Sequence, residues 1–472
     1  MLKKVVAYSF SLYSAALFAS LLRVLVKSYI AKDVGKEALG MYSYYMTLLL
    51  LGSAVLAFGL KRAVAKQVAA EKEEQHFAPL VAGVMALAAA ASLVLGVLAV
   101  LLYGRIETVY LLALVSVGPM TLFELATATL RGQFDQRREV GALIIAVLVQ
   151  AGCVVAASQL LHIEQAPVLG LTLAYGLLAV GVLFYFIRRF PYCWRPSNLA
   201  AEYRSAGFRL LLALSAPIWI SDILAIVGHQ ADQLIVQGRL GYGALAEYAA
   251  AFTFIGLMDQ PMTVLSRVFL VTFAGGHYHD PEPFYQASGL NLALFSLLGF
   301  GVTMVAYPLT PLIFSPEFSL TPVLVLILSI SSIFNSVEVM NSSLAIARDY
   351  PRANRDARLW TTVLYIPLAF WLVSRWGVIG AAWSSVFSWA CYGVLQAFFL
   401  RVRLPAQALA SLRQMLLGTG LYIAALAVVW LSGSGWLILL VAPLYYGLGQ
   451  LLKLWDVRLA VEIFRRLKPG SA

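Results

Sequence analysis

Residues 5–42 read VVAYSFSLYSAALFASLLRVLVKSYIAKDVGKEALGMY, and they decide the fold class. The first part of this stretch follows Lys3 and Lys4 and contains about 25 mostly apolar residues, enough to cross a bilayer as one helix. Arg23 and Lys27 nevertheless lie in the second half of this helix. Because a cation inside a membrane costs roughly 2.5–3.5 kcal/mol on insertion scales, these two positions require an explanation.

Polar residues share one face of this predicted helix. Steps of three, four or seven residues place on that face Ser9, Tyr13, Ser20, Arg23 and Lys27. A polar stripe on a spanning helix should face the interior of a helix bundle or a water-filled cavity. The alternative is that Lys27, near the outer end, extends to the lipid headgroups. Arg23 lies deeper, where that alternative fits less well.

Composition places the chain among all-α polytopic membrane proteins. Of its 472 residues, 61% are hydrophobic and only 12% are charged, and the mean hydropathy is +0.82. The net charge of +11 does not indicate nucleic-acid binding, since the basic residues form short clusters between apolar runs. The three cysteines, Cys153, Cys193 and Cys391, lie far apart and suggest neither a disulfide nor a zinc site. We expect no metal and no other cofactor.

Windows of about 20 apolar residues predict about fourteen membrane spans. They centre near residues 5–30, 39–60, 78–103, 107–130, 140–161, 166–187, 209–237, 243–273, 285–314, 320–347, 358–374, 377–400, 413–431 and 435–453.

The lysines and arginines predict the orientation of these spans. With a cytoplasmic N-terminus, most of them fall in the inside loops, and the outside loops hold only Lys32, Lys36, Arg105, Arg239 and Arg375. This asymmetry predicts a multi-pass protein of a bacterial cell (inner) membrane with both termini in the cytoplasm.

The longest inside loop separates two groups of six spans. We therefore predict an N-lobe at 1–190, a cytoplasmic linker at 191–208, a C-lobe at 209–402, two further spans in 403–453 and a cytoplasmic amphipathic tail at 454–472.

Two short patterns repeat between the predicted lobes. G-x-x-A-L-x-x-Y occurs at Gly35–Tyr42 and again, 206 residues later, at Gly241–Tyr248. V-L-G-L at Val168 is echoed 210 residues later by V-I-G-A at Val378. Six spans are an even number, so the lobes should share one orientation and be related by an axis along the membrane normal. Such repeats place a substrate route at the interface between the lobes.

The seventh span has a second polar face. Ser215, Asp222, His229 and Asp232 lie on it at steps of seven and three. Two carboxylates and an imidazole on a membrane-buried face fit a proton or sodium relay. In the alternative, Asp232 is simply hydrated near the outer end and His229 is a neutral, hydrogen-bonded residue.

Further charged residues fall inside other spans. Asp259 and Arg267 flank Pro261 in the eighth span, Glu124 lies in the fourth and Glu338 in the tenth. Arg267 is close enough to the cytoplasmic end to extend to the headgroups instead. Around Glu338, Ser331, Asn335 and Ser342 form a face too polar for lipid, so the tenth span is predicted to line a cavity. We assign the acids and His229 as candidate ion-coupling residues.

Enzyme signatures are absent from the sequence. It contains no Walker A loop, no H-E-x-x-H motif and no nucleophile elbow, and no soluble segment long enough to host ATP hydrolysis. We therefore predict that the protein is not an enzyme.

Several segments together resemble a known family. They are Lys3-Lys4 before a long helix with a deep arginine, Gly35-Lys36-Glu37-Ala38-Leu39-Gly40-Met41-Tyr42, Phe58-Gly59-Leu60-Lys61-Arg62-Ala63 and Trp376-Gly377-Val378-Ile379-Gly380-Ala381-Ala382. The chain resembles, over nearly its whole length, the Wzx-like oligosaccharide flippases. These polysaccharide-biosynthesis proteins belong to the multidrug/oligosaccharidyl-lipid/polysaccharide exporter superfamily.

The resemblance implies two six-helix lobes around a central cavity, with two extra C-terminal helices. It also implies transfer of an undecaprenyl-pyrophosphate-linked oligosaccharide to the outer leaflet, driven by H⁺ or Na⁺, with membrane lipids, a polysaccharide polymerase and glycosyltransferases as candidate partners. In such proteins cavity cations contact the pyrophosphate, and Arg23 and Arg267 match their positions. We assign to the same role Lys27 and Lys61, and to the polar cavity wall Tyr13, Ser20 and Asn335.

Physical reasoning supports the same function without the family name. A lipid pyrophosphate carries several negative charges, so its passage through hydrocarbon needs a polar route. Arginines in a cavity can supply charge-assisted hydrogen bonds to phosphate oxygens, while the lipid tail stays in the bilayer.

Three other functions compete with this one. A drug or cation antiporter of the same superfamily would favour an acidic, aromatic-rich cavity. A membrane-embedded polymerase or glycosyltransferase would need a large outside loop, and the outside loops here are short. A non-transporting scaffold of a polysaccharide synthesis complex would leave the charges inside the spans hard to explain.

Overall fold

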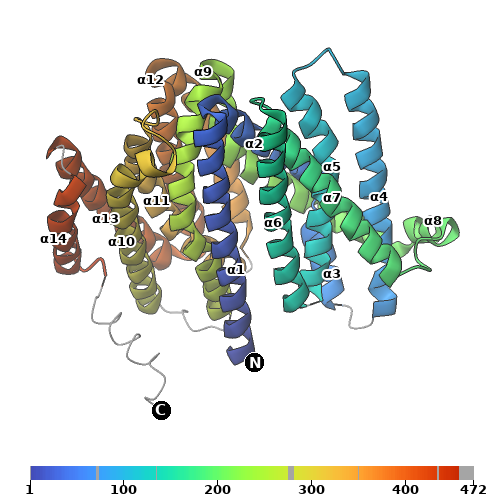
Figure 1. Cartoon of the computed structure of the whole chain (residues 1–472). Coiled ribbons are helices and arrows are strands. Elements are labelled where there is room, and N and C mark those ends of the chain that lie inside the picture. Colours follow the sequence, from blue (N-terminus) through green and yellow to red (C-terminus); the bar gives the residue numbers. More distant parts are fainter. Residues whose placement is uncertain are drawn as a thin grey trace. The chain divides into compact units, whose positions relative to one another are not determined.

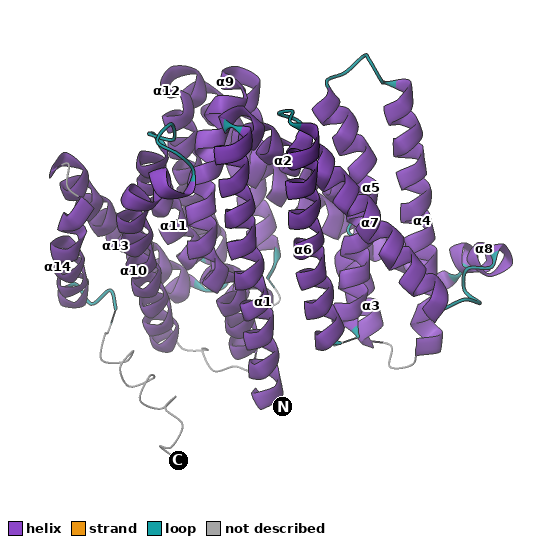
Figure 2. Ribbon diagram, in the orientation of Figure 1, coloured by secondary structure: helices purple, strands orange, loops and turns teal. Residues whose placement is uncertain are grey.

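The computed structural model describes residues 2–70, 74–133, 135–274, 281–348, 350–432 and 435–455. About 90% of the chain is helical, and Figure 2 shows no strand in the described part. The helices, shown in Figure 1, are α1 (Leu2–Tyr29), α2 (Lys36–Ala57), α3 (Leu60–Ala70), α4 (Glu74–Leu101), α5 (Thr108–Gly132), α6 (Gln136–Leu161), α7 (Ala166–Arg189), α8 (Pro196–Arg204), α9 (Ala206–Ala274), α10 (Pro281–Ile313), α11 (Thr321–Ala347), α12 (Arg352–Leu400), α13 (Pro405–Ser432) and α14 (Ile438–Leu451). The predicted all-α polytopic class is confirmed.

Eleven of these helices are long and apolar enough to cross a membrane. Two of them, α9 with 69 residues and α12 with 49, exceed the thickness of a bilayer at 1.5 Å per residue. Each contains a glycine with non-helical dihedral angles, Gly241 in α9 and Gly377 in α12, so each supplies two crossings. With the shorter apolar helix α14, the described helices account for the fourteen predicted spans.

The glycines of the sequence repeats have matching local geometry. Gly35 before α2 has φ 127° and Gly241 has φ 83°, which are left-handed values that side chains rarely adopt. The residues that follow each of them are buried in the same way: Leu39, Leu245 and Tyr248 completely, and Tyr42 nearly so. The pattern therefore marks the start of a buried helix after a glycine break in both places.

The chain divides into two compact units, Met1–Ala246 and Glu247–Ala472, called the N-unit and the C-unit below. In the N-unit, α5 packs against α2, α3, α4 and α7 and is mostly buried. In the C-unit, α11 holds the corresponding inner place, against α10, α12 and α13. The predicted lobe boundaries, which follow the sequence repeat, remain predictions.

Two segments expected to be loops contain helices. In the predicted inside loop after the second span, α3 buries Ala63, Val64 and Val68 in an apolar cluster with α4 and α5. In the predicted linker, α8 packs against α4, and the hydroxyl of Tyr203 donates a hydrogen bond to the carbonyl of Gly83 at 3.0 Å. A short amphipathic helix lacks the long apolar run that identifies a span, so the hydropathy windows missed both. Of the predicted amphipathic tail, residues 456–472 lie outside the described part of the chain.

Candidate functional site

The junction between α2 and α3 positions the first group of charges in the N-unit. Phe58 and Gly59 have left-handed φ values of 45° and 71°, and these break the helix. A Cβ atom on Gly59 would collide with the carbonyl oxygen of Ser215 in α9, so only glycine permits this close approach. The indole N–H of Trp219 donates to the carbonyl of Val55 at 3.1 Å, and its ring lies 4.9 Å from the ring of Phe58. The junction is therefore seated directly on α9.

Lys61, just after this break, reaches α5. Its ammonium nitrogen lies 2.7 Å from Oε2 of Glu124, and both side chains are about one quarter exposed. The hydroxyl of Ser53 donates to the same carboxylate oxygen, and Ser53 in turn accepts a hydrogen bond from Thr121 at 3.2 Å. The structure thus joins Lys61, predicted to bind pyrophosphate, to Glu124, predicted to couple ions.

Arg62, the next residue, points to a different helix. Its Nη2 lies 3.0 Å from Oδ1 of Asp222 in α9. The Asp222 side chain is only 16% exposed, whereas the Arg62 side chain is 70% exposed. The arginine can therefore leave the aspartate without itself losing a buried environment.

The cations of α1 lie near a group of tyrosines. Arg23 is exposed and Lys27 is partly buried. The charge of Arg23 acts on the phenol groups of Tyr42 in α2 and Tyr175 in α7, and that of Glu124 also acts on Tyr175. Among the described residues, Arg23 has no carboxylate at ion-pair distance. Two cations, Arg23 and Lys27, therefore lie one turn apart in a helix long and apolar enough to cross the membrane.

The outer half of the same polar face of α9 has other partners. Asp232 is buried, and its Oδ1 accepts a hydrogen bond from the backbone N–H of Gln233 at 2.8 Å. Thr47 of α2 donates to the side chains of Gln230 at 3.2 Å and Gln233 at 2.8 Å. His229 is exposed. The relay through Asp222, His229 and Asp232 remains a prediction.

In the C-unit, Glu338 is buried on α11 and faces a cation from α12. Nη2 of Arg358 lies 3.9 Å from its Oε1, and the guanidinium stands 4.3 Å above the ring centre of Tyr392. The neighbouring serines of α11 donate to carbonyls of their own helix, as Ser331 does to Leu328 at 2.6 Å. Such bonds satisfy these hydroxyl groups within their own helix, and the cavity along this face of α11 remains a prediction.

The remaining predicted site residues fall in three classes. Asp259 lies on α9 with one buried carboxylate oxygen, Oδ1, that has no hydrogen-bond partner among the described residues. Ser20 and Asn335 are partly buried. Tyr13 and Arg267 lie outside the residues whose side chains are described.

Sequence reasoning missed two charged residues, Arg62 and Arg358, that contact predicted ones. Both lie in predicted inside loops, where a cation is explained by its effect on orientation. For Arg62 a signal existed, because the Phe58-Gly59 break brings the next residues back among the helices. For Arg358 the signal was its position at the predicted cytoplasmic end of the span 358–374. Within the described residues, no group of three or more His, Cys, Asp or Glu side chains is placed to hold a metal ion.

The family comparison gives one match. The model of the family described as "Polysaccharide biosynthesis protein" matches residues 5–270, which is more than half of the chain. Among curated proteins, none matches the sequence.

Solved structures show the same fold at low sequence identity. The inward closed conformation of the lipid II flippase MurJ is 16% identical, with a TM-score of 0.70 over 93% of this chain and 97% of that one. An inward-facing multidrug resistance MATE family transporter of the MOP superfamily is 13% identical, with a TM-score of 0.62 over 82% and 95%. A mutant of the Vibrio cholerae MATE transporter VcmN is 15% identical, with a TM-score of 0.57 over 86% and 99%. At these identities the likeness establishes the fold alone.

Proposed function

Because the chain belongs to the polysaccharide biosynthesis protein family, in the multidrug/oligosaccharidyl-lipid/polysaccharide exporter superfamily, we propose that it is a flippase. Its substrate is an undecaprenyl-pyrophosphate-linked oligosaccharide, which it moves from the cytoplasmic to the outer leaflet. It acts by alternating access and performs no covalent chemistry.

The observation that supports this substrate most strongly is the excess of cations in the membrane-spanning part of the N-unit. Arg23 has no acidic partner among the described residues, and Lys27 lies one turn away on the same helix. A pyrophosphate offers several anionic oxygens to which such cations donate charge-assisted hydrogen bonds. The lipid tail can remain in the bilayer while the charged group passes.

Asp222 is the carboxylate that we propose for ion coupling. It is largely buried, and its partner Arg62 is largely exposed. A proton or Na⁺ at Asp222 would compete with Arg62 and release the contact between α3 and α9. A ligand shifts a conformational equilibrium only through different affinities for the two states, and an ion pair present in one state supplies that difference.

The test is translocation of the lipid-linked oligosaccharide in proteoliposomes with an imposed pH or sodium gradient. We expect Arg23→Ala and Lys27→Ala to slow transport about tenfold or more, since each removes a charge-assisted contact of about 1.5–3 kcal/mol. Arg105→Ala, which removes an exposed cation between α4 and α5, is the matched control and should transport normally. If Arg23→Ala and Lys27→Ala transport as fast as Arg105→Ala and wild type, the α1 cations are headgroup anchors and the proposed binding site is wrong.

A second candidate function, export of organic cations, is favoured by one feature of the N-unit. The ring of Tyr44 meets those of Tyr110 and Tyr242 edge to face at 5.9 Å, and Tyr242 donates to Glu107 at 2.8 Å. Tyrosine faces beside a carboxylate can bind a cation. Efflux of an organic cation without movement of any glycolipid would select this function.

A further inference from the structure

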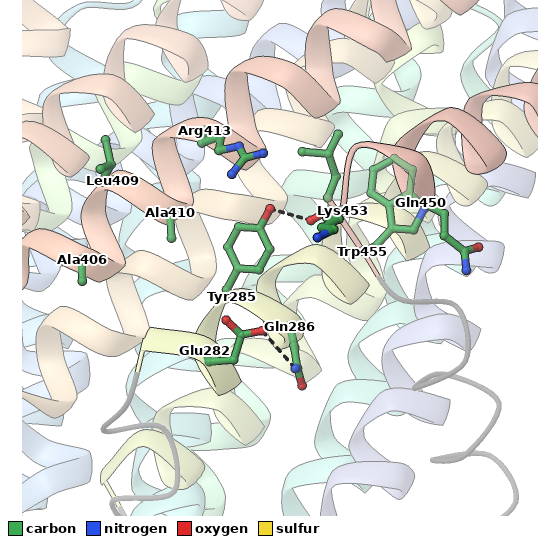
Figure 3. A pocket seen from close by; sticks show the side chains of 11 residues that line it. Glu282, Tyr285, Gln286, Ala406, Leu409, Ala410, Arg413, Gln450, Lys453 and Trp455 are labelled. Carbon is green, nitrogen blue, oxygen red and sulfur yellow. Dashed lines mark hydrogen bonds between the residues drawn. The ribbon is translucent and has the colours of Figure 1, made fainter.

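A cavity of about 830 Å³ in the C-unit plays no part in the proposed function. Its walls come from the first turns of α10 and α13 and from the last turn of α14 with the residues that follow it (Figure 3). The predicted topology places all three ends on the cytoplasmic side. Leu409 in its wall is 70% exposed, and Leu451, which follows the lining residue Gln450 in the chain, is 79% exposed, as expected for side chains that contact lipid tails. The cavity therefore lies at the boundary between the membrane and the cytoplasm.

One wall of the cavity is the turn that follows α14, residues 452–455. Lys453 in this turn has a left-handed φ of 56°, which an amino acid with a side chain rarely adopts. Its carbonyl accepts a hydrogen bond from the hydroxyl of Tyr285 at 2.6 Å. The side-chain amide of Gln414 donates to the carbonyl of Leu454 at 2.9 Å and to that of Tyr285 at 2.7 Å. Residues of α10 and α13 thus hold the turn in an otherwise unfavourable conformation.

Two glycines and a tryptophan pack closely at the same turn. A Cβ atom on Gly289 would collide with the carbonyl oxygen of Leu454, and one on Gly449 would collide with the ring of Trp455. That ring lies 5.1 Å from the ring of Tyr445, and its N–H donates to the carbonyl of Tyr446 at 3.3 Å. The turn is therefore a rigid element, and its position places Lys453 in the cavity.

The charges of the cavity are not balanced. Arg413 and Lys453 both line it, and among the described residues neither has a carboxylate at ion-pair distance. Glu282 is the acid in the cavity wall, and it accepts a hydrogen bond from the side-chain amide of Gln286 at 3.2 Å. Figure 3 shows Tyr285 between Glu282 and Arg413. Two cations and one carboxylate leave one net positive charge.

We propose that this cavity binds the headgroup of an anionic phospholipid of the cytoplasmic leaflet, of the phosphatidylglycerol type. Arg413 and Lys453 donate to the phosphate oxygens, and the acyl chains lie along the exposed leucines of α13 and α14. A headgroup with one negative charge neutralises the net charge of the cavity. The bound lipid would hold together the cytoplasmic ends of α13 and α14, and its binding is independent of the proposed function.

The experiment measures lipid retention by the purified full-length protein, using native mass spectrometry and thermal unfolding with added phosphatidylglycerol or phosphatidylcholine. Wild type should retain phosphatidylglycerol in preference to phosphatidylcholine. In Arg413→Ala/Lys453→Ala, the affinity for phosphatidylglycerol should fall about tenfold or more and the preference should disappear. Arg401→Ala, a cytoplasmic cation that stacks at 3.9 Å on Phe398 outside the cavity, should change neither.

A variant with the opposite expected effect separates binding from misfolding. Glu282→Gln removes the carboxylate, so it should raise the affinity for phosphatidylglycerol. A lower affinity for phosphatidylglycerol would contradict the charge argument and overturn the anionic assignment. Equal retention of both lipids by wild type would overturn it as well.

Two further comparisons identify the source of the phosphate. Undecaprenyl phosphate presents a phosphate monoester on another tail, and if it displaces phosphatidylglycerol at equal concentration the resident-phospholipid assignment is wrong. The basic tail could also attract anionic lipid. If Arg465→Ala/Arg466→Ala abolishes the preference and Arg413→Ala/Lys453→Ala does not, the cavity is not the site.

Discussion

At the residue scale, the arrangement of Lys61 and Arg62 shows how adjacent side chains reach different helices. Successive residues of an α-helix point about 100° apart, so two neighbours cannot face the same partner. The break at Phe58-Gly59 sets the direction of α3, and from there Lys61 meets Glu124 of α5 while Arg62 meets Asp222 of α9. The cations of one short helix, α3, therefore link two others, α5 and α9, within the N-unit.

The exposure of these ion pairs bounds their contribution to stability. Exposed pairs contribute about 0.2–1 kcal/mol, and Arg62 is 70% exposed. In a double-mutant cycle with Arg62→Ala and Asp222→Ala, we therefore expect a coupling energy of about 1 kcal/mol in thermal or chemical unfolding. Transport by both single variants should lose much of its response to the ion gradient. A coupling above about 3 kcal/mol would identify a structural ion pair, not a contact that opens during transport.

The candidate site could be predicted only in part. Arg23, Glu124 and Asp222 stand out in the sequence because charge inside a span is costly. Their partners do not stand out, because Arg62 and Arg358 lie in clusters that also orient the chain in the membrane. Whether a cation at the edge of a span faces lipid, solvent or a carboxylate depends on how neighbouring helices pack.

At the scale of the element, glycines determine where the long helices break and how closely neighbours approach. Gly170 in α7 and Gly380 in α12, which the sequence repeat makes equivalent, both lack space for a Cβ atom. A Cβ atom on Gly170 would collide with the backbone of α6 at Cys153. A Cβ atom on Gly380 would collide with the backbone at Leu372, which precedes the break in α12. In both units, therefore, a glycine without space for a Cβ atom lets a helix pack closely against the one that precedes it.

The inner helices of the two units share a second feature. Glu124 on α5 and Glu338 on α11 lie at nearly the same distance from the start of their helices, and each faces one cation. The repeat thus extends from glycines to charge pairs, although the sequence pattern around the two acids differs.

A pair of glycines in α7 tests the packing argument. A Cβ atom on Gly170 would lie 2.5 Å from the carbonyl oxygen of Cys153, whereas a Cβ on Gly176 would meet nothing within 4 Å. Gly170→Ala should destabilise the protein by about 1–3 kcal/mol because the backbones of α6 and α7 must separate. Gly176→Ala should be neutral or stabilise it by up to about 1 kcal/mol through helix propensity. The two variants are compared by thermal unfolding in one detergent. Equal melting temperatures would contradict the close contact between Gly170 and the backbone at Cys153.

At the scale of the whole molecule, the distribution of charge predicts the orientation in the membrane. The predicted topology puts α8 in the cytoplasm and the connection between α4 and α5 outside. In a chain with Cys153, Cys193 and Cys391 replaced by alanine, a membrane-impermeant maleimide should label Arg105→Cys in intact cells. It should label Ser197→Cys, on exposed α8, only after permeabilisation. The reverse pattern would invert the topology and move the lipid cavity to the outer leaflet.

The sequence by itself determined the helical class, the fourteen spans and the family resemblance, and it located the two glycine breaks of the repeat. These follow from local properties, since the bilayer sets the length of each apolar run and glycine alone adopts left-handed angles at low cost. The tertiary structure decided which charges meet: Lys61 with Glu124, Arg62 with Asp222, Glu338 with Arg358. It also decided that α3 and α8 are helices and that Lys453 and Arg413 line one cavity. Such pairs depend on packing between residues far apart in the chain, which neither hydropathy nor spacing records.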